Sequence, residues 1–392
     1  MKKKAFQKIE VSRLGMGNMR LPSVDAKDSK APIDYPEAIK LIRRAYEEGI
    51  NYFDTAWPYH GGKAELVIGE ILKQYPRESF YLADKFPGHQ IAPSYDVKGV
   101  FEKQLKKCGV EYFDFYLLHN VYENSIAVYE DERWNILPYL LEQKKNGRIR
   151  HLGFSTHAGV PALEAFLEKH ANEMEFCQIE LNYLDWTLQQ AKEKCELLNR
   201  YSIPIWVMEP VRGGKLANLP AAAQEKLHAL RPEASAASWA LRWVQEIPGV
   251  TMILSGMSNM AQMQDNLATF DHPEPLSAEE QALLLEIAEG FKSAVPCTAC
   301  RYCCDGCPQE IDIPQMLRVL NELRVVPSTN AIMAVEALPK SRQPQSCLGC
   351  GACTAVCPQK IDIPGCMQEL TERIAKIPSW IEISRQRAAE QP

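Results

Sequence analysis

Residues 36–56 read PEAIKLIRRAYEEGINYFDTA, a helix pattern followed directly by a strand pattern. Pro36 suits the first turn of a helix, because its fixed φ angle and missing N–H cost nothing there. Ile39, Ile42 and Tyr46 then share one apolar face. The run INYFDTA that follows is short, apolar and rich in residues that favour strands. The stretch therefore predicts one helix and one strand in succession.

The same alternation recurs along the body of the chain. Amphipathic stretches such as VFEKQLKKCG, WNILPYLLEQKKNG, TLQQAKEKCELLNRY and SAASWALRWVQEI separate the strand-like runs. Those runs lie at residues 11–20, 50–56, 79–86, 112–120, 149–157, 176–183, 203–210 and 249–256. Eight β–α units over about 270 residues predict an α/β fold of the (β/α)8 or TIM barrel type.

A doubly wound open sheet is the alternative fold, and it would want a glycine-rich dinucleotide turn after its first strand. The segment GMGNMR offers Gly15 and Gly17, but Arg20 occupies the place of the third glycine. No acidic residue at a strand end about 20 residues further on supports that motif. The barrel is therefore favoured.

A barrel of this type keeps its chemistry at the carboxyl ends of its strands. Three consecutive strand ends carry Asp54, Lys85 and His119, and Tyr59 follows in the loop after Asp54. Each alone is more simply a salt bridge, a satisfied histidine or a core tyrosine. Together they form a proton-donating set, in which the Lys85 ammonium would lower the pKa of Tyr59. Asp54 would then hold Lys85, while His119 orients a carbonyl oxygen.

Six motifs resemble the aldo-keto reductase family over roughly the first 290 residues: FDTAWPYHGGKAELVIGEIL, YLADKF, DFYLLHN, HLGFSTH, QIELNY and MEPVRGGKL. The resemblance implies transfer of a hydride from NAD(P)H to an aldehyde or ketone, with a tyrosine as the acid. By motif, the implied residues are the catalytic tetrad Asp54, Tyr59, Lys85 and His119, and the nicotinamide-carboxamide contacts Ser155 and Gln178. Thr156 stands where many members have asparagine.

Two departures from the family pattern concern the cofactor. Where members often stack a tyrosine on the nicotinamide ring, the chain carries Met208 or Glu209. Where many members present Lys, Ser and Arg to the 2′-phosphate of NADPH, it has Gly256, Met257 and Gln262. With no cation in this loop, NADPH loses a charge-assisted partner, so NADH is the expected cofactor.

The loops after the seventh and eighth strands of such a barrel often bind phosphate. Arg212, Gly213 and Lys215 lie after the seventh strand and are candidate contacts for the phosphate of a dinucleotide or of a flavin. No dedicated flavin motif is legible elsewhere in the sequence.

Ten of the 13 cysteines lie between Cys297 and Cys366, mostly in two successive C-x2-C-x2-C-x3-C-P runs. Bacterial [4Fe–4S] ferredoxins have this spacing, and in them the fourth cysteine of each run ligates the other cluster. Zinc usually takes separated C-x2-C pairs and fits less well, and disulfides are the other alternative. The predicted ligands are Cys297, Cys300, Cys303 and Cys357 for one cluster, and Cys347, Cys350, Cys353 and Cys307 for the other. Cys304 leaves the choice of Cys303 ambiguous.

The segments CPQEIDIP and CPQKIDIP resemble helical dicluster ferredoxin modules. A barrel followed by such a module resembles the iron–sulfur aldo-keto reductases of anaerobic bacteria and archaea. We therefore expect a barrel over residues 1–275, a connecting helix over 276–294 and a ferredoxin-like domain over 295–392. Ser277 is the expected N-cap of the connecting helix.

Composition narrows the class further. The net charge of −6, with both signs interspersed, leaves no basic patch for nucleic acid. No apolar run reaches the length of a membrane-spanning helix, and the charged start MKKKAFQKIE has no hydrophobic segment behind it. We expect a cytoplasmic protein in a reducing compartment, without membrane insertion.

Three functions remain open on the sequence. The first is a nicotinamide-dependent reductase of a small carbonyl compound. The second is a single-electron reductase, in which a ferredoxin or another electron-transfer protein feeds the clusters and a flavin or the substrate takes electrons. The third is a redox-sensing or docking protein whose barrel is a scaffold.

Overall fold

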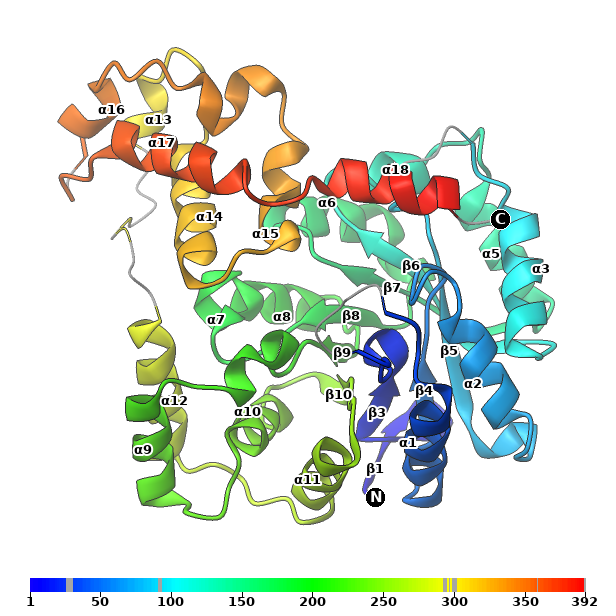
Figure 1. The fold of residues 1–392 in the computed structure, drawn as a ribbon. Coiled ribbons are helices and arrows are strands. Elements are labelled where there is room, and N and C mark those ends of the chain that lie inside the picture. Colours follow the sequence, from blue (N-terminus) through cyan, green and yellow to red (C-terminus); the bar gives the residue numbers. More distant parts are fainter. Residues whose placement is uncertain are drawn as a thin grey trace.

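The computed structural model describes residues 1–25, 31–90, 94–291, 295, 297, 302–357 and 359–390. Eight parallel strands close a barrel in the order β10-β3-β4-β5-β6-β7-β8-β9, which confirms the predicted TIM barrel (Figure 1). These strands are β3 (Leu14–Gly17), β4 (Tyr52–Asp54), β5 (Tyr81–Phe86), β6 (Phe113–Val121), β7 (Ile149–Thr156), β8 (Cys177–Glu180), β9 (Ile205–Met208) and β10 (Val250–Ser255).

Helices surround this barrel and follow the predicted amphipathic stretches. The longer ones are α1 (Tyr35–Glu47), α2 (Ala64–Leu72), α3 (Val97–Cys108), α5 (Ile136–Lys145), α6 (Val160–His170), α8 (Ala191–Arg200), α9 (Ala221–Leu230), α10 (Ala236–Gln245), α11 (Met260–Asp271) and α12 (Ala278–Gly290). Two single-turn helices, α4 (Ile126–Tyr129) and α7 (Asp185–Leu188), lie in loops at the carboxyl ends of strands.

Local capping explains where these helices begin. The Asp34 side chain accepts a hydrogen bond from the Glu37 N–H and starts α1, with Pro36 in its first turn. Ser277 and Glu280 form a capping box at the start of α12, as the sequence indicates. The stretch predicted as one helix over 187–201 is divided, because Gln190 adopts a left-handed φ of 54° between α7 and α8.

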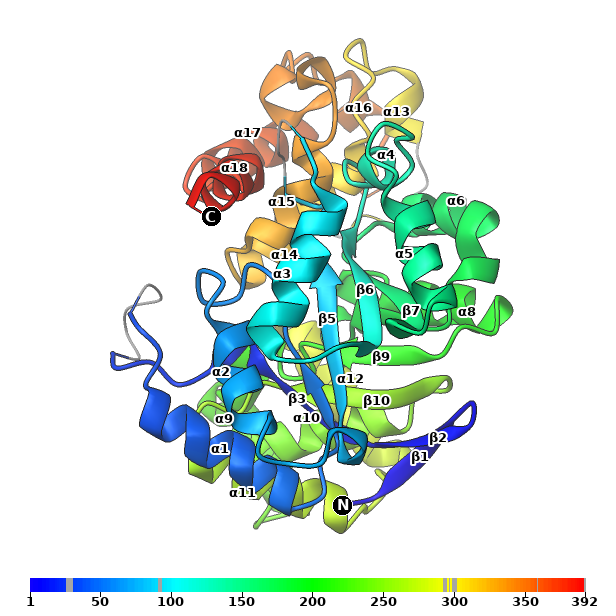
Figure 2. The same cartoon turned by 90° about the vertical axis from the view of Figure 1, so that its right-hand side faces the viewer.

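A hairpin of β1 (Lys3–Phe6) and β2 (Ile9–Ser12) closes the amino end of the barrel (Figure 2). It brings Phe6 into the barrel interior, where its ring lies 4.9 Å from Trp206 and 5.6 Å from Phe115. Tyr52 and Met252 belong to the same buried cluster. Because aromatic side chains fill this end, a reaction site must lie at the other end of the barrel.

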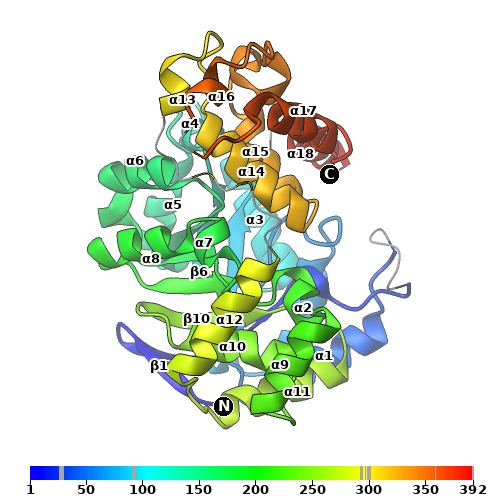
Figure 3. The same cartoon turned by 90° about the vertical axis from the view of Figure 1, so that its left-hand side faces the viewer.

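The tail after α12 is helical and repeats itself. Its elements are α13 (Tyr302–Asp305), α14 (Ile313–Val325), α15 (Thr329–Glu336), α16 (Ala352–Ala355), α17 (Ile363–Ile374) and α18 (Trp380–Glu390). Asp312 caps α14 and Asp362 caps α17 in the same way, each shortly after the end of a cysteine run. Helices α14 and α17 pack together over their own apolar core (Figure 3).

The tail lies on the carboxyl ends of the barrel strands, as Figures 1 and 2 show from two sides. Met333 of α15 is 2% exposed and belongs to the hydrophobic core of the barrel rather than to that of the tail. Helix α14 packs against α7 in the same region. Within the described residues, no helix combines the length and the apolar character needed to cross a membrane.

Candidate active site

The four predicted catalytic residues meet at the mouth of the barrel, on β4, β5, β6 and the loop after β4. Lys85 Nζ lies 2.5 Å from Asp54 Oδ1 and 3.3 Å from the Tyr59 hydroxyl. It also donates to the Thr55 carbonyl oxygen at 2.7 Å. The ammonium therefore joins the carboxylate to the phenol.

His119 faces Tyr59 from the next strand, with ring centroids 5.9 Å apart and an edge-on angle of 87°. Its carbonyl oxygen accepts a hydrogen bond from the Tyr129 hydroxyl at 2.7 Å. A carbonyl group placed between these two rings would meet both a phenol and an imidazole, which is the arrangement that general acid catalysis needs.

Burial decides the protonation states of this group. Burial alone would lower the pKa of Lys85, but the Asp54 carboxylate and the Tyr59 hydroxyl raise it above its ordinary value. Lys85 is completely buried, so its charge is stable only because these partners are in place.

The pKa of Tyr59 differs from the sequence-based expectation. Burial raises it above its ordinary value, and the neighbouring Lys85 ammonium only partly offsets that effect. Desolvation disfavours the phenolate more than one nearby ammonium favours it. The phenol therefore keeps its proton at neutral pH and can donate it to an oxygen that gains negative charge.

Ser155, Thr156, Gln178 and Met208 lie together on β7, β8 and β9, across the mouth from Tyr59. Gln178 Oε1 is buried without a hydrogen-bond partner among the described residues. Gln178 Nε2 lies 3.6 Å from Met208 Sδ. Because an amide N–H would satisfy the orphaned oxygen, these residues fit the carboxamide end of a nicotinamide.

The two hydroxyl groups beside Gln178 differ in what they leave free. Ser155 Oγ accepts from the Asn120 N–H at 2.8 Å, so its own hydrogen is available to a ligand. Thr156 Oγ1 donates to the Val121 carbonyl oxygen at 2.7 Å and accepts from the Ala158 N–H at 2.9 Å. Thr156 thus holds the backbone, whereas Ser155 can contact a ligand.

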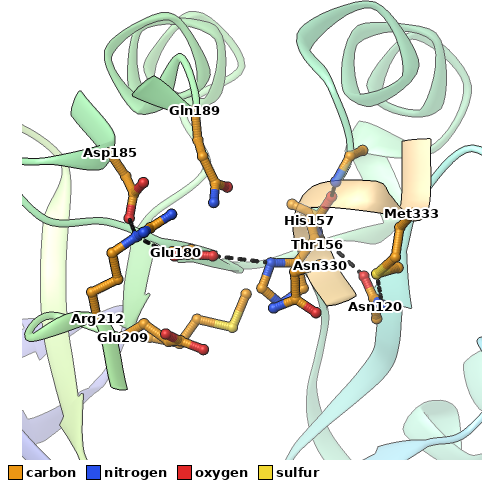
Figure 4. Close-up of polar contacts among 12 residues, drawn as sticks. Asn120, Thr156, His157, Glu180, Asp185, Gln189, Glu209, Arg212, Asn330 and Met333 are labelled. Carbon is orange, nitrogen blue, oxygen red and sulfur yellow. Dashed lines mark hydrogen bonds and ion pairs between the residues drawn. The ribbon is translucent and has the colours of Figure 1, made fainter. Parts of the chain in front are cut away.

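Arg212, at the start of the 3-10 segment Arg212–Ala217, lies at the centre of a buried charged cluster under the tail (Figure 4). Its Nε donates to Asp185 Oδ2 at 2.9 Å and lies 3.8 Å from Glu180 Oε1. Its Nη2 donates to Glu322 Oε1 of α14 at 3.3 Å. The guanidinium is therefore neutralised by protein carboxylates, and it is a poor fit for the phosphates of a dinucleotide.

Carboxylates outnumber cations in this cluster. Burial raises the pKa of Glu180, Glu209 and Glu322, and that of Glu322 reaches about 7. Burial also lowers the pKa of His157 to about 3, so its ring is neutral where its Nδ1 lies 3.3 Å from Glu180 Oε2. The cluster thus holds Arg212 firmly and repels further negative charge.

Sequence reasoning left the loop after β10 without a cation, and the structure corrects this. The exposed side chain of Arg20 lies beside both Gly213 and Gly256. A Cβ atom on Gly213 would come within 2.9 Å of the Arg20 guanidinium, and one on Gly256 within 3.1 Å of Arg20 Cβ. Gln262 accepts from the Ser258 N–H at 2.8 Å and closes the loop on itself. The missed cation follows β3, the first strand of the barrel in the sequence, whereas the loop beside it follows β10, the last strand.

A second candidate site lies in the tail. One pocket is lined by Cys347, Cys350, Cys353 and, from the first run, Cys307. Cys357, the fourth cysteine of the second run, is not among its lining residues. This is the crossed set that the spacing predicts for one of the two clusters.

The other predicted set is only partly visible. Cys297 and Cys303 lie in the tail core or against it, as does Cys357, and Cys300 lies outside the described residues. Cys303 is buried, whereas Cys304 is half-buried. Across the described part of the chain, no three His, Cys, Asp or Glu side chains converge on one point that would hold a single metal ion.

Comparison with known proteins gives two family matches. The model described as "Aldo/keto reductase family" matches residues 13–289, and the model described as "4Fe-4S dicluster domain" matches residues 296–361.

Curated relatives match the barrel. "Probable aldo-keto reductase 1" from Glycine max is 28% identical over 315 residues, which is 69% of this chain and 86% of the relative. "NADH-specific methylglyoxal reductase" from Escherichia coli (strain K12) is 23% identical over 327 residues, 72% of this chain and 97% of the relative.

Solved structures share the fold. The aldo-keto reductase AKR11C1 from Bacillus halodurans in its holo form has a TM-score of 0.58 at 23% identity, over 73% of this chain and 96% of that one. The thermostable aldo-keto reductase Tm1743 has a TM-score of 0.57 at 22% identity, over 73% of this chain and all of that one.

Replacing Glu322 by Gln should stabilise the protein increasingly as the pH rises. Burial raises the pKa of Glu322 to about 7, from 4.5, so docking of α14 favours the protonated form. Its contribution to stability is complete below about pH 4.5 and is lost as the pH rises through about 7. The Glu322→Gln variant should therefore match the wild type near pH 5 and exceed its Tm by roughly 2–8 °C near pH 8, the shift expected for about 1–2 kcal/mol.

Calorimetry across this pH range measures the difference. Glu372→Gln is the matched control, because Glu372 is the exposed residue at the equivalent position of the second repeat. A difference between Glu322→Gln and wild type that does not change with pH would contradict the assignment.

Proposed function

Because the chain belongs to the aldo/keto reductase family, we propose that it reduces a small aldehyde or ketone at the mouth of its barrel. The observation that carries the proposal is the Lys85 ammonium, which contacts both the Asp54 carboxylate and the Tyr59 hydroxyl. A nicotinamide dinucleotide, when bound, supplies two electrons as a hydride. Everything else in the reaction falls to side chains of the protein.

Tyr59 is the proposed proton donor. The substrate oxygen lies between the Tyr59 hydroxyl and the His119 ring, and it takes the phenol proton as negative charge develops on it. Lys85 stabilises the phenolate that remains, since its ammonium lies 3.3 Å from that oxygen. Asp54 fixes Lys85 in place, and His119 orients the carbonyl group.

NADH is the proposed donor, held at its nicotinamide end by Ser155 and Gln178 and facing Met208. The E. coli relative is called NADH-specific, which supports this choice. The absence of Lys and Arg from the segment 256–262 points the same way. Arg20 is a cation beside this loop that could favour NADPH instead. Gly213, Gly256 and Gln262 are proposed as backbone and loop contacts.

The tail carries a 4Fe–4S dicluster domain, and we propose that it holds two [4Fe–4S] clusters that exchange electrons with the mouth. Helix α14 begins just after the first cysteine run, and its Glu322 contacts Arg212. The stretch from Ile313 to Glu322 spans about 14 Å along the helix axis. This direct path supports the second candidate function, in which a ferredoxin or similar protein in the reducing cytoplasm supplies single electrons, with a flavin as candidate acceptor.

Tyr59→Phe should slow carbonyl reduction by about 10²–10⁴-fold, the usual worth of a positioned general acid. Affinity for NADH should stay unchanged, because the hydroxyl is not a proposed contact of the cofactor. Steady-state rates with methylglyoxal and NADH measure the effect. Lys85→Met should lower the rate similarly, since the tyrosine then loses the cation that stabilises its phenolate. A wild-type rate in Tyr59→Phe would remove this group from the mechanism.

Anaerobically isolated protein should contain about eight irons per chain with matching sulfide, the content of two [4Fe–4S] clusters. Cys307→Ser should disturb the cluster held by Cys347, Cys350 and Cys353, as seen by metal analysis and electron paramagnetic resonance. Cys366→Ser, which changes a cysteine outside both runs, is the control and should keep all the iron. Zinc in place of iron would defeat the assignment.

Single-turnover assays separate the two candidate functions. Protein stripped of nicotinamide and reduced with dithionite should form product if the clusters conduct electrons. Protein given only NADH should form product if the hydride route operates, and NADPH should work no better than NADH. Product in the NADH arm alone would defeat the conducting role.

Arg20→Ala is the control for cofactor choice, because it should weaken NADPH binding and leave NADH binding unchanged.

A further inference from the structure

The tail touches the mouth through equivalent positions of its two repeats. Asn330 lies in α15, and Trp380 lies at the equivalent position of the second repeat, at the start of α18. Asn330 Nδ2 lies 3.5 Å from His157 Nε2. The Trp380 ring stacks on the His89 ring, with centroids 5.6 Å apart and an angle of 18°. Each repeat therefore places one side chain on a histidine of the barrel rim.

His89 connects Trp380 to the catalytic site. Its ring centroid lies 4.2 Å from that of His119, and the His119 ring meets the Tyr59 ring at 5.9 Å. His89 is 2% exposed. Four rings thus form an unbroken series from the proposed proton donor to the last helix of the chain.

The barrel and the tail support His89 from different sides. The Tyr129 hydroxyl donates to the His119 carbonyl oxygen at 2.7 Å and lies 3.1 Å from the Phe86 carbonyl oxygen, and so ties the ends of β5 and β6 together. A Cβ atom on Gly88 would come within 2.5 Å of the Tyr129 ring, so the turn before His89 packs tightly on that ring. The flat face of His89 lies on Trp380 of the tail.

Trp380 is itself fixed by both domains. Its backbone N–H donates to Glu336 Oε2 at 3.1 Å, which joins α18 to α15. Its side chain packs against the hydrophobic core of the barrel. Met333 anchors α15 in that same core, with its Sδ 4.0 Å from Asn120 Nδ2 (Figure 4). These contacts therefore hold the indole ring in place beside His89.

We propose that Trp380 is a positioning residue for catalysis, which holds His89 against His119 and so fixes the imidazole that faces Tyr59. The active site is then incomplete without α18, the helix that begins at Trp380. For the role of His119 the inference rests on the proposed function, but the ring contacts stand independently of it. Loss of the Trp380 ring would allow His89 to tilt and His119 to turn away from the substrate oxygen.

Three substitutions at one position separate ring stacking from simple packing. Trp380→Phe keeps an aromatic face, Trp380→Leu keeps an apolar side chain without a ring, and Trp380→Ala removes both. With methylglyoxal and NADH, the Leu and Ala variants should lose about 10- to 100-fold in kcat with little change in KM, because a misplaced group slows chemistry more than binding. Trp380→Phe should recover most of the rate. Wild-type kcat in the Leu variant would overturn the proposal.

Chemical modification gives a readout that needs no turnover. Diethyl pyrocarbonate, with the modified histidines mapped by mass spectrometry, should label His119 faster in Trp380→Leu than in Trp380→Phe. Asn330→Ala is the matched control from the other repeat, and it should expose His157 but leave His119 labelling as in the wild type. Equal labelling of His119 in the Leu and Phe variants would overturn the proposal. Unchanged iron content in both variants shows that the tail is intact in this comparison.

The two readouts also distinguish this inference from the proposed function. If wild-type protein reduces no carbonyl compound with NADH, the proposed function fails, while faster labelling of His119 in Trp380→Leu still supports the positioning contact. If the wild type reduces a carbonyl compound, and Trp380→Leu and Trp380→Phe match it in rate and in labelling of His119, the positioning contact fails and the proposed function stands. If Trp380→Ala loses its iron or its fold, the Leu and Phe pair decides the question.

Discussion

A fully buried ammonium group imposes the strictest local requirement in this molecule. Lys85 is out of contact with water, and such a charge is tolerated only with close, well-placed partners. Asp54, the Thr55 carbonyl oxygen and Tyr59 supply them, which ties β5 to β4 and to the loop after it. A structural need and the proposed catalytic arrangement thus coincide, because the groups that make the charge tolerable also place a phenol at the mouth.

The parallel barrel explains why the tail and the chemistry share one face. The carboxyl ends of all eight barrel strands lie on one face, while Phe6 and its aromatic neighbours fill the opposite end. A helical module that packs on the loops of this face therefore lies beside the proposed catalytic residues. Met333 contacts Asn120, Trp380 contacts His89 and Glu322 contacts Arg212, each from a different helix.

The sequence pattern predicted the features that depend on neighbouring residues, namely the order of helices and strands and the spacing of the cysteines. The alternation that begins at residues 36–56 indicated the barrel, and strand ends indicated where Asp54, Lys85 and His119 would converge. The repeated cysteine spacing indicated a crossed set, and Cys307 does line a pocket with Cys347, Cys350 and Cys353.

Burial and long-range packing could not be predicted from the sequence pattern. The direction of the Tyr59 pKa depends on desolvation, which spacing does not report. Glu322 looks like any acidic residue on an amphipathic helix, and only the fold shows that it meets Arg212. Arg20 reaches the loop after β10 because β3 and β10 are neighbours in the closed barrel, although they are far apart in the sequence. Trp380 lies in the ordinary segment IPSWIEIS, where a helix start was the most that the pattern could indicate.

The duplicated tail has equal halves in fold but unequal halves in surroundings. Glu322 of the first half is buried against Arg212, and its counterpart Glu372 in the second half is exposed. In the second cysteine run, Leu348 and Val356 are 65% and 51% exposed, and Cys350 between them is exposed too. Docking on the barrel therefore breaks an internal symmetry. The same position of the repeat is thus constrained by contact with the barrel in the first half and free to vary in the second, so the two halves can diverge in sequence at unequal rates.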